Sequence, residues 1–314
     1  MKILVTGGGG FIGRHLVKAL CASEENRVTV LDNFSTSSES DFSELKNLKN
    51  VQLVKWDVST PFSFDCDVIF NLACPASPVQ YQKNPVETSR TNFLGTLHAL
   101  ELAREKNAVM VQASTSEVYG DPKFSPQVES YWGNVNPIGI RSCYDEGKRV
   151  AETLCFDFFR EYKTSIKVAR IFNTYGPGMA FNDGRVVSNF IVQALNDIGI
   201  SIYGQGEQTR SFCYVSDTVQ GLLKLAFAPT EITGPINIGN PNEITIRTLS
   251  EEILRLTNSN STITYHPLPE DDPVQRQPDI SVAMKILGWK PEIDLQKGLG
   301  LTISDFRDRL KEAN

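Results

Sequence analysis

"TGGGGFIG", residues 6–13, follows an apolar run at residues 2–6 and opens an amphipathic segment at residues 11–22. The glycines stand at a G-x-x-G-x-x-G spacing. Because glycine has no Cβ, such a turn lets the backbone amides of a helix N-terminus approach a pyrophosphate. Glycine clusters also occur in purely structural turns, but a strand before and a helix after favour a dinucleotide site. The residues expected to bind the dinucleotide here are Gly7, Gly10, Phe11, Ile12 and Gly13.

An acidic residue ends the second expected strand, at the distance from the turn that a dinucleotide site requires. Asp32 closes "VTVLD", about 20 residues beyond the glycines. A carboxylate at this point accepts both ribose hydroxyls of NAD and repels the additional phosphate of NADP. The alternative interpretation of Asp32 is a turn-forming residue ahead of Asn33. Further NAD contacts are expected from Asn33, Asp57, Val58, Leu72 and Ala73, with Asp57 at the adenine amino group.

Apolar strands alternate with amphipathic helices through the first half of the chain. This alternation predicts an α/β fold with a Rossmann-like, doubly wound parallel sheet. The expected strands are residues 2–6, 27–31, 51–54, 67–72, 108–113 and 165–171, and the expected helices are residues 11–22, 91–105 and 143–162.

The pattern loosens after "RIFNTYGPG", which indicates a smaller C-terminal α/β lobe that binds the substrate. Helices are expected there near residues 185–197, 216–227 and 296–311, the second of them capped by Asp217. We expect an NAD-binding Rossmann domain at residues 1–172, rejoined by about 211–240, and a substrate lobe over most of 173–314. Ligands should lie between the two, at the carboxyl ends of the strands.

Composition and charge exclude several classes of function. The net charge of −6 and the lack of a basic stripe argue against nucleic acid or an anionic membrane as the main partner. No apolar run approaches the roughly 20 residues of a membrane span, and the chain opens on a strand without a signal peptide. Six scattered cysteines indicate reduced thiols and a cytoplasmic protein. Three histidines without ligand spacing argue against a metal site.

"CYDEGKRVAE", residues 143–152, places Tyr144 and Lys148 at i and i+4 on one face of an expected helix. The ammonium group of Lys148, aided by the charge of the nicotinamide, should lower the pKa of the Tyr144 phenol from its free value of about 10 toward neutrality. The phenolate can then take a proton from a substrate hydroxyl while a hydride passes to NAD. Y-x-x-x-K is common by chance, but the dinucleotide turn and the "ASTS" strand end at 113–116 favour a catalytic role.

With these motifs the chain resembles the extended short-chain dehydrogenase/reductase family over nearly its whole length. The resemblance implies that the hydroxyl of Thr115 completes a triad with Tyr144 and Lys148. Members of this family mostly act on nucleotide sugars, which they oxidise transiently at carbon 4. Asn173 and Arg210 match positions that hold the nucleotide diphosphate, a surface ion pair being the alternative for Arg210.

Longer segments resemble one group within that family, the UDP-glucuronate decarboxylases or UDP-xylose synthases. They are "NLACPASP" at 71–78, "STSEVYGDP" at 114–122, "YWGNVNPIG" at 131–139, "RSCYDEGKRVAET" at 141–153 and "RQPDI" at 276–280. The resemblance implies oxidation at sugar carbon 4, loss of carbon dioxide from the resulting β-keto acid, and re-reduction that regenerates NAD.

The same resemblance implies a set of site residues. The catalytic set is Thr115, Ser116, Glu117, Tyr144, Lys148 and Arg276, and the substrate-binding set is Pro78, Glu117, Asn173, Arg185, Arg210 and Arg276. Glu117 and Arg276 handle the carboxylate of the sugar, and the sequence does not separate their roles in decarboxylation and protonation. A solvated charge at a helix start is the alternative for Arg185.

Other reactions on the same fold are the alternatives. A nucleotide-sugar 4,6-dehydratase carries an Asp-Glu pair after the threonine, where this chain has Ser116 and Glu117. A 4-epimerase needs neither that pair nor an arginine like Arg276. A non-enzymatic NAD sensor typically lacks the tyrosine or the lysine. Two features depart from the decarboxylase pattern: Arg90 replaces the usual lysine, and "DNFSTSSES" at 32–40 lacks "TGR" or "TGS", which leaves adenosine contacts open.

The resemblance also implies a homodimer that acts on a UDP-sugar. The helices expected at residues 91–105 and 143–162 would pair across a two-fold axis into a four-helix bundle. Their apolar residues could equally belong to the core of one chain.

Overall fold

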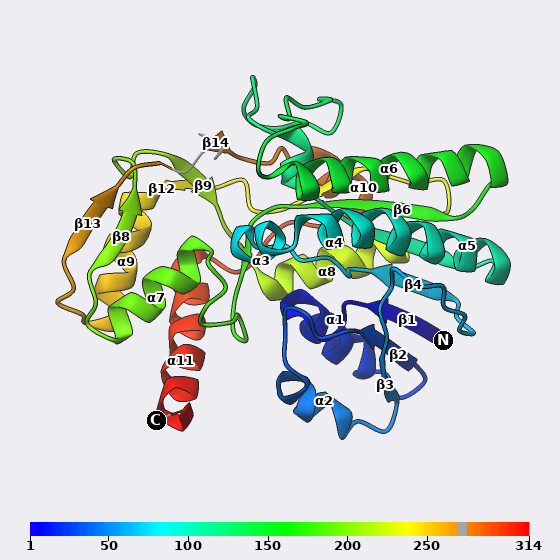
Figure 1. Ribbon diagram of the computed structural model, residues 1–314, viewed down its shortest axis with the longest axis horizontal. Coiled ribbons are helices and arrows are strands. Elements are labelled where there is room, and N and C mark those ends of the chain that lie inside the picture. The colour runs from blue at the N-terminus through cyan, green and yellow to red at the C-terminus, as the bar shows by residue number, and fades with distance from the viewer. Residues whose placement is uncertain (269–274, 314) are drawn as a thin grey trace.

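The computed structural model describes residues 1–268 and 275–313. It has two lobes that lie next to each other along the longest axis of the molecule (Figure 1). One lobe holds the N-terminus and a large sheet, and the other holds the C-terminal helix. In the described part of the chain, no helix combines the length and the apolar character that crossing a membrane requires.

Seven parallel strands form the large sheet, in the order β11-β6-β5-β4-β1-β2-β3. They are β1 (Lys2–Thr6), β2 (Arg27–Asp32), β3 (Val51–Lys55), β4 (Val68–Asn71), β5 (Val109–Thr115), β6 (Ile166–Ile171) and β11 (Ile236–Ile238). Strands β1 to β6 have the order of a Rossmann fold, in which the strand order reverses between β1 and β4. The predicted doubly wound α/β fold is therefore confirmed, and its ligand crevice lies at that reversal.

Side chains of β1 point alternately into two cores. Ile3 and Val5 belong to the core on one face of the sheet, and Leu4 belongs to the core on the other. The helices over the first face are α1 (Phe11–Cys21) and α8 (Val215–Ala226), and those over the second are α5 (Thr96–Lys106) and α6 (Ser142–Tyr162). An apolar run without polar alternation is what a parallel strand covered on both faces needs.

The helix expected at residues 91–105 begins earlier than predicted and has an irregular centre. α4 (Pro85–Arg90) runs into a π-helical turn at Thr91–Gly95, and α5 follows. Pro85 at the first position of α4 is a helix-start signal. The wide turn seats Asn92 against Gly147 of α6, where an added Cβ would lie 2.6 Å from Asn92 Nδ2.

The second lobe contains two of the expected helices, those near 185–197 and 296–311, together with short strands that were not predicted. Its helices are α7 (Val186–Leu195), α9 (Ile246–Thr257) and α11 (Leu295–Ala313). α10 (Ser281–Leu287) packs against α8 and β11 of the first lobe, and the helix expected at 216–227 is α8 itself (Figure 1). β8 (Ile200–Tyr203) pairs with β13 (Ile263–His266), and β9 (Thr209–Ser211) lies between β12 (Glu243–Thr245) and β14 (Gln275–Arg276). Strands this short show too few alternations for a pattern to emerge.

The remaining elements are short segments around the strand ends. They are α2 (Ser43–Lys46), α3 (Pro78–Lys83), the paired strands β7 (Thr174–Tyr175) and β10 (Cys213–Tyr214), and the 3-10 turns η1 (Glu39–Phe42) and η3 (Ser116–Tyr119).

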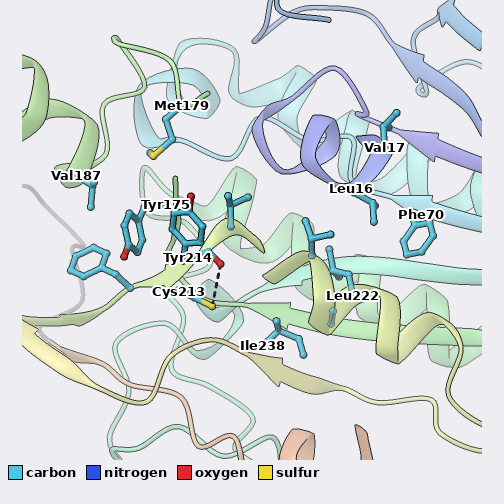
Figure 2. Packing of buried hydrophobic residues seen from close by; sticks show 14 of the residues in the cluster. Leu16, Val17, Phe70, Tyr175, Met179, Val187, Cys213, Tyr214, Leu222 and Ile238 are labelled. Atoms are coloured by element: carbon cyan, nitrogen blue, oxygen red, sulfur yellow. Dashed lines mark hydrogen bonds between the residues drawn. The ribbon is translucent and has the colours of Figure 1, made fainter. Parts of the chain in front are cut away.

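One hydrophobic core runs from the first lobe into the second (Figure 2). Leu16 of α1 and Leu222 of α8 lie toward the large sheet, and Val187 of α7 lies in the second lobe. Tyr175 and Tyr214, whose ring centroids are 5.7 Å apart, join the two sides where β7 pairs with β10. Because both lobes share this close-packed core, packing sets the space between them.

Asp217 does not cap α8 as expected. It lies inside the first turn, and Tyr214 occupies the N-cap position. Asp217 Oδ2 accepts hydrogen bonds from the backbone amides of Glu292 and Ile293 at 3.1 and 3.0 Å, and its carbonyl accepts one from Trp289 Nε1 at 3.0 Å. The residue is structural because it fastens the segment that precedes α11 to α8.

A buried ion pair fastens α6 to the large sheet. Arg170 of β6 donates to Glu152 of α6 twice, from Nε to Oε1 at 2.9 Å and from Nη2 to Oε2 at 2.7 Å. Ser114 of β5 donates to the same carboxylate at 2.5 Å. Arg170 Nη1 also donates to the Tyr119 hydroxyl at 3.0 Å, which donates to Asn237 Oδ1 at 2.7 Å. The network fixes where α6 stands relative to β5, β6 and β11.

Removing the charge of Glu152 should destabilise the fold strongly. In Glu152→Gln the buried guanidinium of Arg170 loses its counter-charge, so we expect the free energy of unfolding to fall by about 3 kcal/mol or more. Urea denaturation followed by circular dichroism measures this. The matched control is Asp157→Asn, which breaks an exposed pair with Arg160 on the same helix and should cost less than about 1 kcal/mol. Equal losses in the two variants would contradict the assignment.

Candidate active site

A cavity of about 1410 Å³ opens at the carboxyl ends of the parallel strands and is lined by residues of both lobes. Every site residue expected from the sequence lines it, with the exception of Asp57. Asp57 instead accepts hydrogen bonds from Asn33 Nδ2 at 3.1 Å and from the Ser59 amide at 2.8 Å. Its flanking residues Trp56 and Val58 do line the cavity. Contact between Asp57 and adenine stays a prediction.

The glycine turn is shaped for close approach by a ligand. Gly7 has a φ of +68°, and an added Cβ would lie 2.7 Å from Ala73 Cα. A Cβ at Gly13 would lie 2.3 Å from the Gly7 carbonyl oxygen. Gly10, the N-cap of α1, forms no side-chain cap, so no side chain covers the first amides of the helix. The turn therefore offers backbone amides and the helix dipole to an anion such as a pyrophosphate.

Asp32 is held at the end of β2 by backbone amides. Its Oδ2 accepts from Gly9 and its Oδ1 accepts from Phe34, both at 2.8 Å. Burial raises the pKa of Asp32 above its ordinary value, and the amide hydrogen bonds act in the opposite direction. The carboxylate lines the cavity beside the glycine turn, where it fits the ribose contact that the sequence predicts.

Tyr144 and Lys148 stand together on α6, and both line the cavity. Lys148 Nζ lies 5.8 Å from the centroid of the Tyr144 ring and donates to the Ala113 carbonyl at 2.9 Å. The Thr115 side chain lies near the Tyr144 phenol and acts to lower the pKa of that phenol. Burial, followed by the nearby Cys74, nevertheless raises the pKa of Tyr144. In the protein alone the direction is therefore opposite to the one expected with NAD bound, because desolvation outweighs the effect of Thr115.

Tyr81 of α3 packs face to face on Tyr144 and was not predicted. The two ring centroids lie 5.0 Å apart with an interplanar angle of 6°. The Tyr81 hydroxyl is buried, and among the described residues it has no hydrogen-bond partner. Burial raises its pKa as well. The stack holds the Tyr144 ring in one orientation, and no spacing in the sequence connects two residues so far apart.

Glu117 lies at the centre of a cluster of arginines. Its Oε2 accepts hydrogen bonds from Arg141 Nη2 and, at 2.6 Å, from Arg276 Nη2. Ser116 Oγ lies 3.5 Å from Glu117 Oε1. Burial acts to raise the pKa of Glu117, but the charges of Arg276, Arg141 and Arg210 outweigh it and the pKa is lowered. A carboxylate and several guanidinium groups thus share one buried site.

The arginines reach this point from distant parts of the chain. Arg276 on β14 and Arg210 on β9 are register partners in the small sheet, and both side chains are buried. Arg141 is the N-cap residue of α6 and was not predicted as a site residue. The sequence feature that could have indicated a site role for Arg141 is its position three residues before Tyr144, at the start of the same helix.

The remaining expected substrate residues line the cavity near the second lobe. Asn173 follows β6, Pro78 begins α3, and Arg185 is the N-cap residue of α7. Arg185 is not simply solvated, because its Nη2 donates to Asp183 Oδ2 at 2.7 Å and its side chain is only 27% exposed. Whether these residues hold a nucleotide remains a prediction.

The glycine turn, the acid at the end of β2 and the Tyr144–Lys148 pair above the strand ends define a class of protein: Rossmann-type enzymes that use a bound dinucleotide. More narrowly, the chain belongs to the NAD-dependent epimerase/dehydratase family, whose sequence profile matches residues 3–239. NAD, the expected cofactor, is the cofactor of this family.

Curated relatives are similar over nearly the full chain. UDP-glucuronic acid decarboxylase 6 of Arabidopsis thaliana is 53% identical over 310 residues, which cover 99% of this chain and 90% of the plant protein. UDP-glucuronic acid decarboxylase 1 of Xenopus tropicalis is 48% identical, over 99% of this chain and 73% of the frog protein. The crystal structure of UDP-glucuronic acid 4-epimerase from Bacillus cereus with UDP-glucuronic acid and NAD has a TM-score of 0.89 at 26% identity, over 98% of this chain and 100% of that one.

Closing the glycine turn should weaken NAD binding. In Gly13→Ala the new methyl group would meet the Gly7 carbonyl at 2.3 Å, so the turn must open and its amides must move. We expect NAD affinity to fall by about tenfold or more, measured by isothermal titration calorimetry. Gly300→Ala is the control, because an added Cβ there has no heavy atom within 4 Å. Unchanged affinity in Gly13→Ala would remove the turn from the cofactor site.

Proposed function

We propose that this chain is an NAD-dependent UDP-glucuronate decarboxylase, a carboxy-lyase that converts UDP-glucuronate to UDP-xylose. The observation that carries the proposal is Glu117 held between Arg141 and Arg276, beside a neutral Ser116 and within the cavity that also holds Tyr144. The cationic groups suit a carboxylated sugar. Relatives named as UDP-glucuronic acid decarboxylases, at about half identity over nearly the whole chain, support the same substrate.

The redox part of the reaction belongs to Tyr144, Lys148 and Thr115. Bound NAD would supply the hydride acceptor for sugar carbon 4 and the hydride donor for its later reduction. Tyr144 takes the proton of the carbon-4 hydroxyl and later returns it. Because burial raises the pKa of the phenol, its deprotonation needs positive charge close by. Lys148, whose Nζ is anchored on the Ala113 carbonyl, holds such a charge below the ring.

Decarboxylation follows from the position of the new ketone, which is β to the substrate carboxylate. The bond between carbon 5 and the carboxylate carbon breaks, carbon dioxide leaves, and the electron pair flows into an enolate at the carbon-4 oxygen. Tyr144, now protonated, and Thr115 donate hydrogen bonds to that oxyanion. Carbon 5 then takes up a proton. Glu117 and Arg276 orient the carboxylate or assist this protonation, and Asn173, Arg185 and Arg210 hold the nucleotide diphosphate.

Ser116 separates this reaction from dehydration. An aspartate at this position would face the glucuronate carboxylate at around 4 Å, a repulsion of about 4 kcal/mol at an effective dielectric constant of 20. Serine avoids the repulsion and offers a hydrogen-bond donor. The 4-epimerase alternative has specific support, because the Bacillus cereus neighbour is named as a UDP-glucuronic acid 4-epimerase. Its product keeps six sugar carbons, so product analysis separates the two reactions.

Incubation with UDP-glucuronate and catalytic NAD is the direct test. We expect UDP-xylose and carbon dioxide without net NADH, measured by mass spectrometry and by absorbance. Tyr144→Phe should bind NAD normally and lose turnover, which also distinguishes an enzyme from an NAD sensor. A six-carbon isomer as the main product would replace the decarboxylase with an epimerase.

Ser116→Asp should be far more damaging than loss of the hydroxyl alone. The added charge repels the substrate carboxylate, so kcat/KM for UDP-glucuronate should fall by up to roughly a thousandfold. Ser116→Ala removes the donor without adding charge and is expected to cost about tenfold. If the aspartate variant decarboxylates as fast as the alanine variant, electrostatic exclusion is not the role of Ser116.

For assembly and location, we propose a cytoplasmic homodimer formed through a four-helix bundle of α5 and α6. Phe93, next to α5, and Tyr162, at the end of α6, expose 41% and 39% of their surface, which supports an apolar contact. The six cysteines are free thiols, the state that a reducing compartment maintains. Light scattering should give a dimeric mass, and a monomer would exclude the bundle.

We also propose the domain division at residue 172, with residues 211–240 returning to the NAD-binding domain.

A further inference from the structure

Residues 177–179, called the strap below, run between α1 and α11 and belong to no helix or strand. On one side the strap is bound by two consecutive side chains of α1. His15 Nε2 donates a hydrogen bond to the Pro177 carbonyl at 2.8 Å, and Arg14 Nη2 donates to the Gly178 carbonyl at 2.6 Å. Because both bonds are made to the backbone, they fix the path of the chain at the strap.

The other side of the strap is bound by α11 of the second lobe. Arg309 Nη2 donates to the Met179 carbonyl at 2.9 Å, and Asp305 Oδ2 accepts from the Gly178 amide at 2.9 Å. Each of the three strap carbonyls thus accepts a hydrogen bond from a side chain of one of these two helices. Side chains from both lobes therefore fix a segment that would otherwise be a mobile surface loop.

Arg14 also reaches a second loop, the one that follows Asp32. Its Nη1 donates to the Asp41 carbonyl of η1 at 2.9 Å and lies 3.9 Å from Asp41 Oδ1. The side chain of Arg14 is only 20% exposed, and its guanidinium carries donors on both terminal nitrogens in a fixed planar fork. One group therefore joins α1 to two loops at once, which a lysine with a single nitrogen could not do in the same geometry.

The sheet order places these two loops on opposite sides of the glycine turn. The turn follows β1, which lies between β2 and β4. The Asp41 loop follows β2 on one side, whereas the strap follows β6 and β7, and β6 lies on the other side of β1. Arg14 comes one residue after Gly13, the last glycine of the turn. Arg14, Asp41 and Gly178 all line the cavity, so Arg14 connects two of its walls beside the expected place of the NAD pyrophosphate.

The strap leads directly into residues of the second lobe that face the glycine turn. Residues 180–185 continue from it and line the cavity, and Arg185 Cζ lies 5.9 Å from the centroid of the Phe11 ring at the start of α1. A strap that moved away from α1 would take this contact with it and widen the cavity at the turn. The reaction proposed above needs one NAD to receive the hydride and to return it, so early release of the reduced cofactor would end the cycle.

We propose that Arg14 is a positioning residue that slows the release of NAD, because it holds the strap and the Asp41 loop together around the glycine turn. This inference rests on the proposed function for the reason why the cofactor must stay, whereas the hold itself concerns NAD, the cofactor of the family. Without the guanidinium, α1 loses one hydrogen bond to each loop, and the two walls of the cofactor site can separate.

The test is the rate at which the enzyme releases NADH. NADH-loaded enzyme is mixed with a large excess of NAD in a stopped-flow instrument, and the fall in the fluorescence of bound NADH gives the dissociation rate. Arg14→Met keeps the length of the side chain without its donors, and its rate should rise by about tenfold or more, as the loss of one to two hydrogen bonds implies. Arg14→Lys can serve only one of the two carbonyls and should lie in between. Arg160→Met, which breaks an exposed pair on α6, should leave the rate unchanged.

His15→Phe is a second variant, and it removes a single strap bond. It keeps an aromatic ring beside Phe11, whose ring centroid lies 5.6 Å from that of His15, and it should accelerate release less than Arg14→Met does. If Arg14→Met lowers the free energy of unfolding but leaves NADH dissociation unchanged, Arg14 is purely structural and the proposal is overturned. A wild type that releases NADH faster than it turns over UDP-glucuronate overturns it without any variant.

Failure of the proposed function would give a different result. In that case the wild type retains NADH and Arg14→Met releases it faster, but neither protein forms carbon dioxide from UDP-glucuronate. The hold of Arg14 on the cofactor would then stand, and only the assigned reaction would be wrong.

Discussion

The buried pair of Glu152 and Arg170 is the constraint on which the site depends. Glu152 lies one helical turn beyond Lys148, and it accepts a hydrogen bond from Ser114, the neighbour of Thr115. The same carboxylate therefore ties the helix that carries Tyr144 to the strand that carries the threonine. A buried ion pair of this kind contributes little net stability compared with an apolar contact, but it admits few geometries. Its main effect is to hold Tyr144, Lys148 and Thr115 in register.

The network continues toward the part of the cavity that Arg276 lines. Asn237, which accepts from Tyr119, donates to the carbonyls of Gln127 and Asp279 at 2.9 Å each. Asp279 lies shortly after Arg276, so the strand that presents this arginine is fastened to the same framework. One connected set of polar groups thus positions both ends of the cavity, and each buried member is satisfied by another.

Much of this protein was predictable because its signals are local. The glycine turn, Asp32 and the Tyr144–Lys148 spacing each lie within one strand, turn or helix, and the sheet follows from apolar runs such as that of β1. Arg141 was missed although it lies next to a recognised motif, since helix-start arginines are common. Tyr81 was missed because its role comes from stacking on Tyr144, which no spacing encodes. For the protein alone, the pKa of Tyr144 moves opposite to the direction predicted with NAD bound, because a sequence shows charges but not desolvation.

By itself the sequence determined the strand-turn-helix units, the preference for NAD and the pairing of a tyrosine with a lysine, since all of these depend on residues a few positions apart. Only the tertiary structure decided which arginines pair with Glu117. Arg141 comes from the start of α6, whereas Arg276 comes from β14, beyond most of the second lobe. Bringing them to one carboxylate requires the common core and the small sheet of β9 and β14. Long-range packing sets that meeting point, and with it the charge in this part of the cavity.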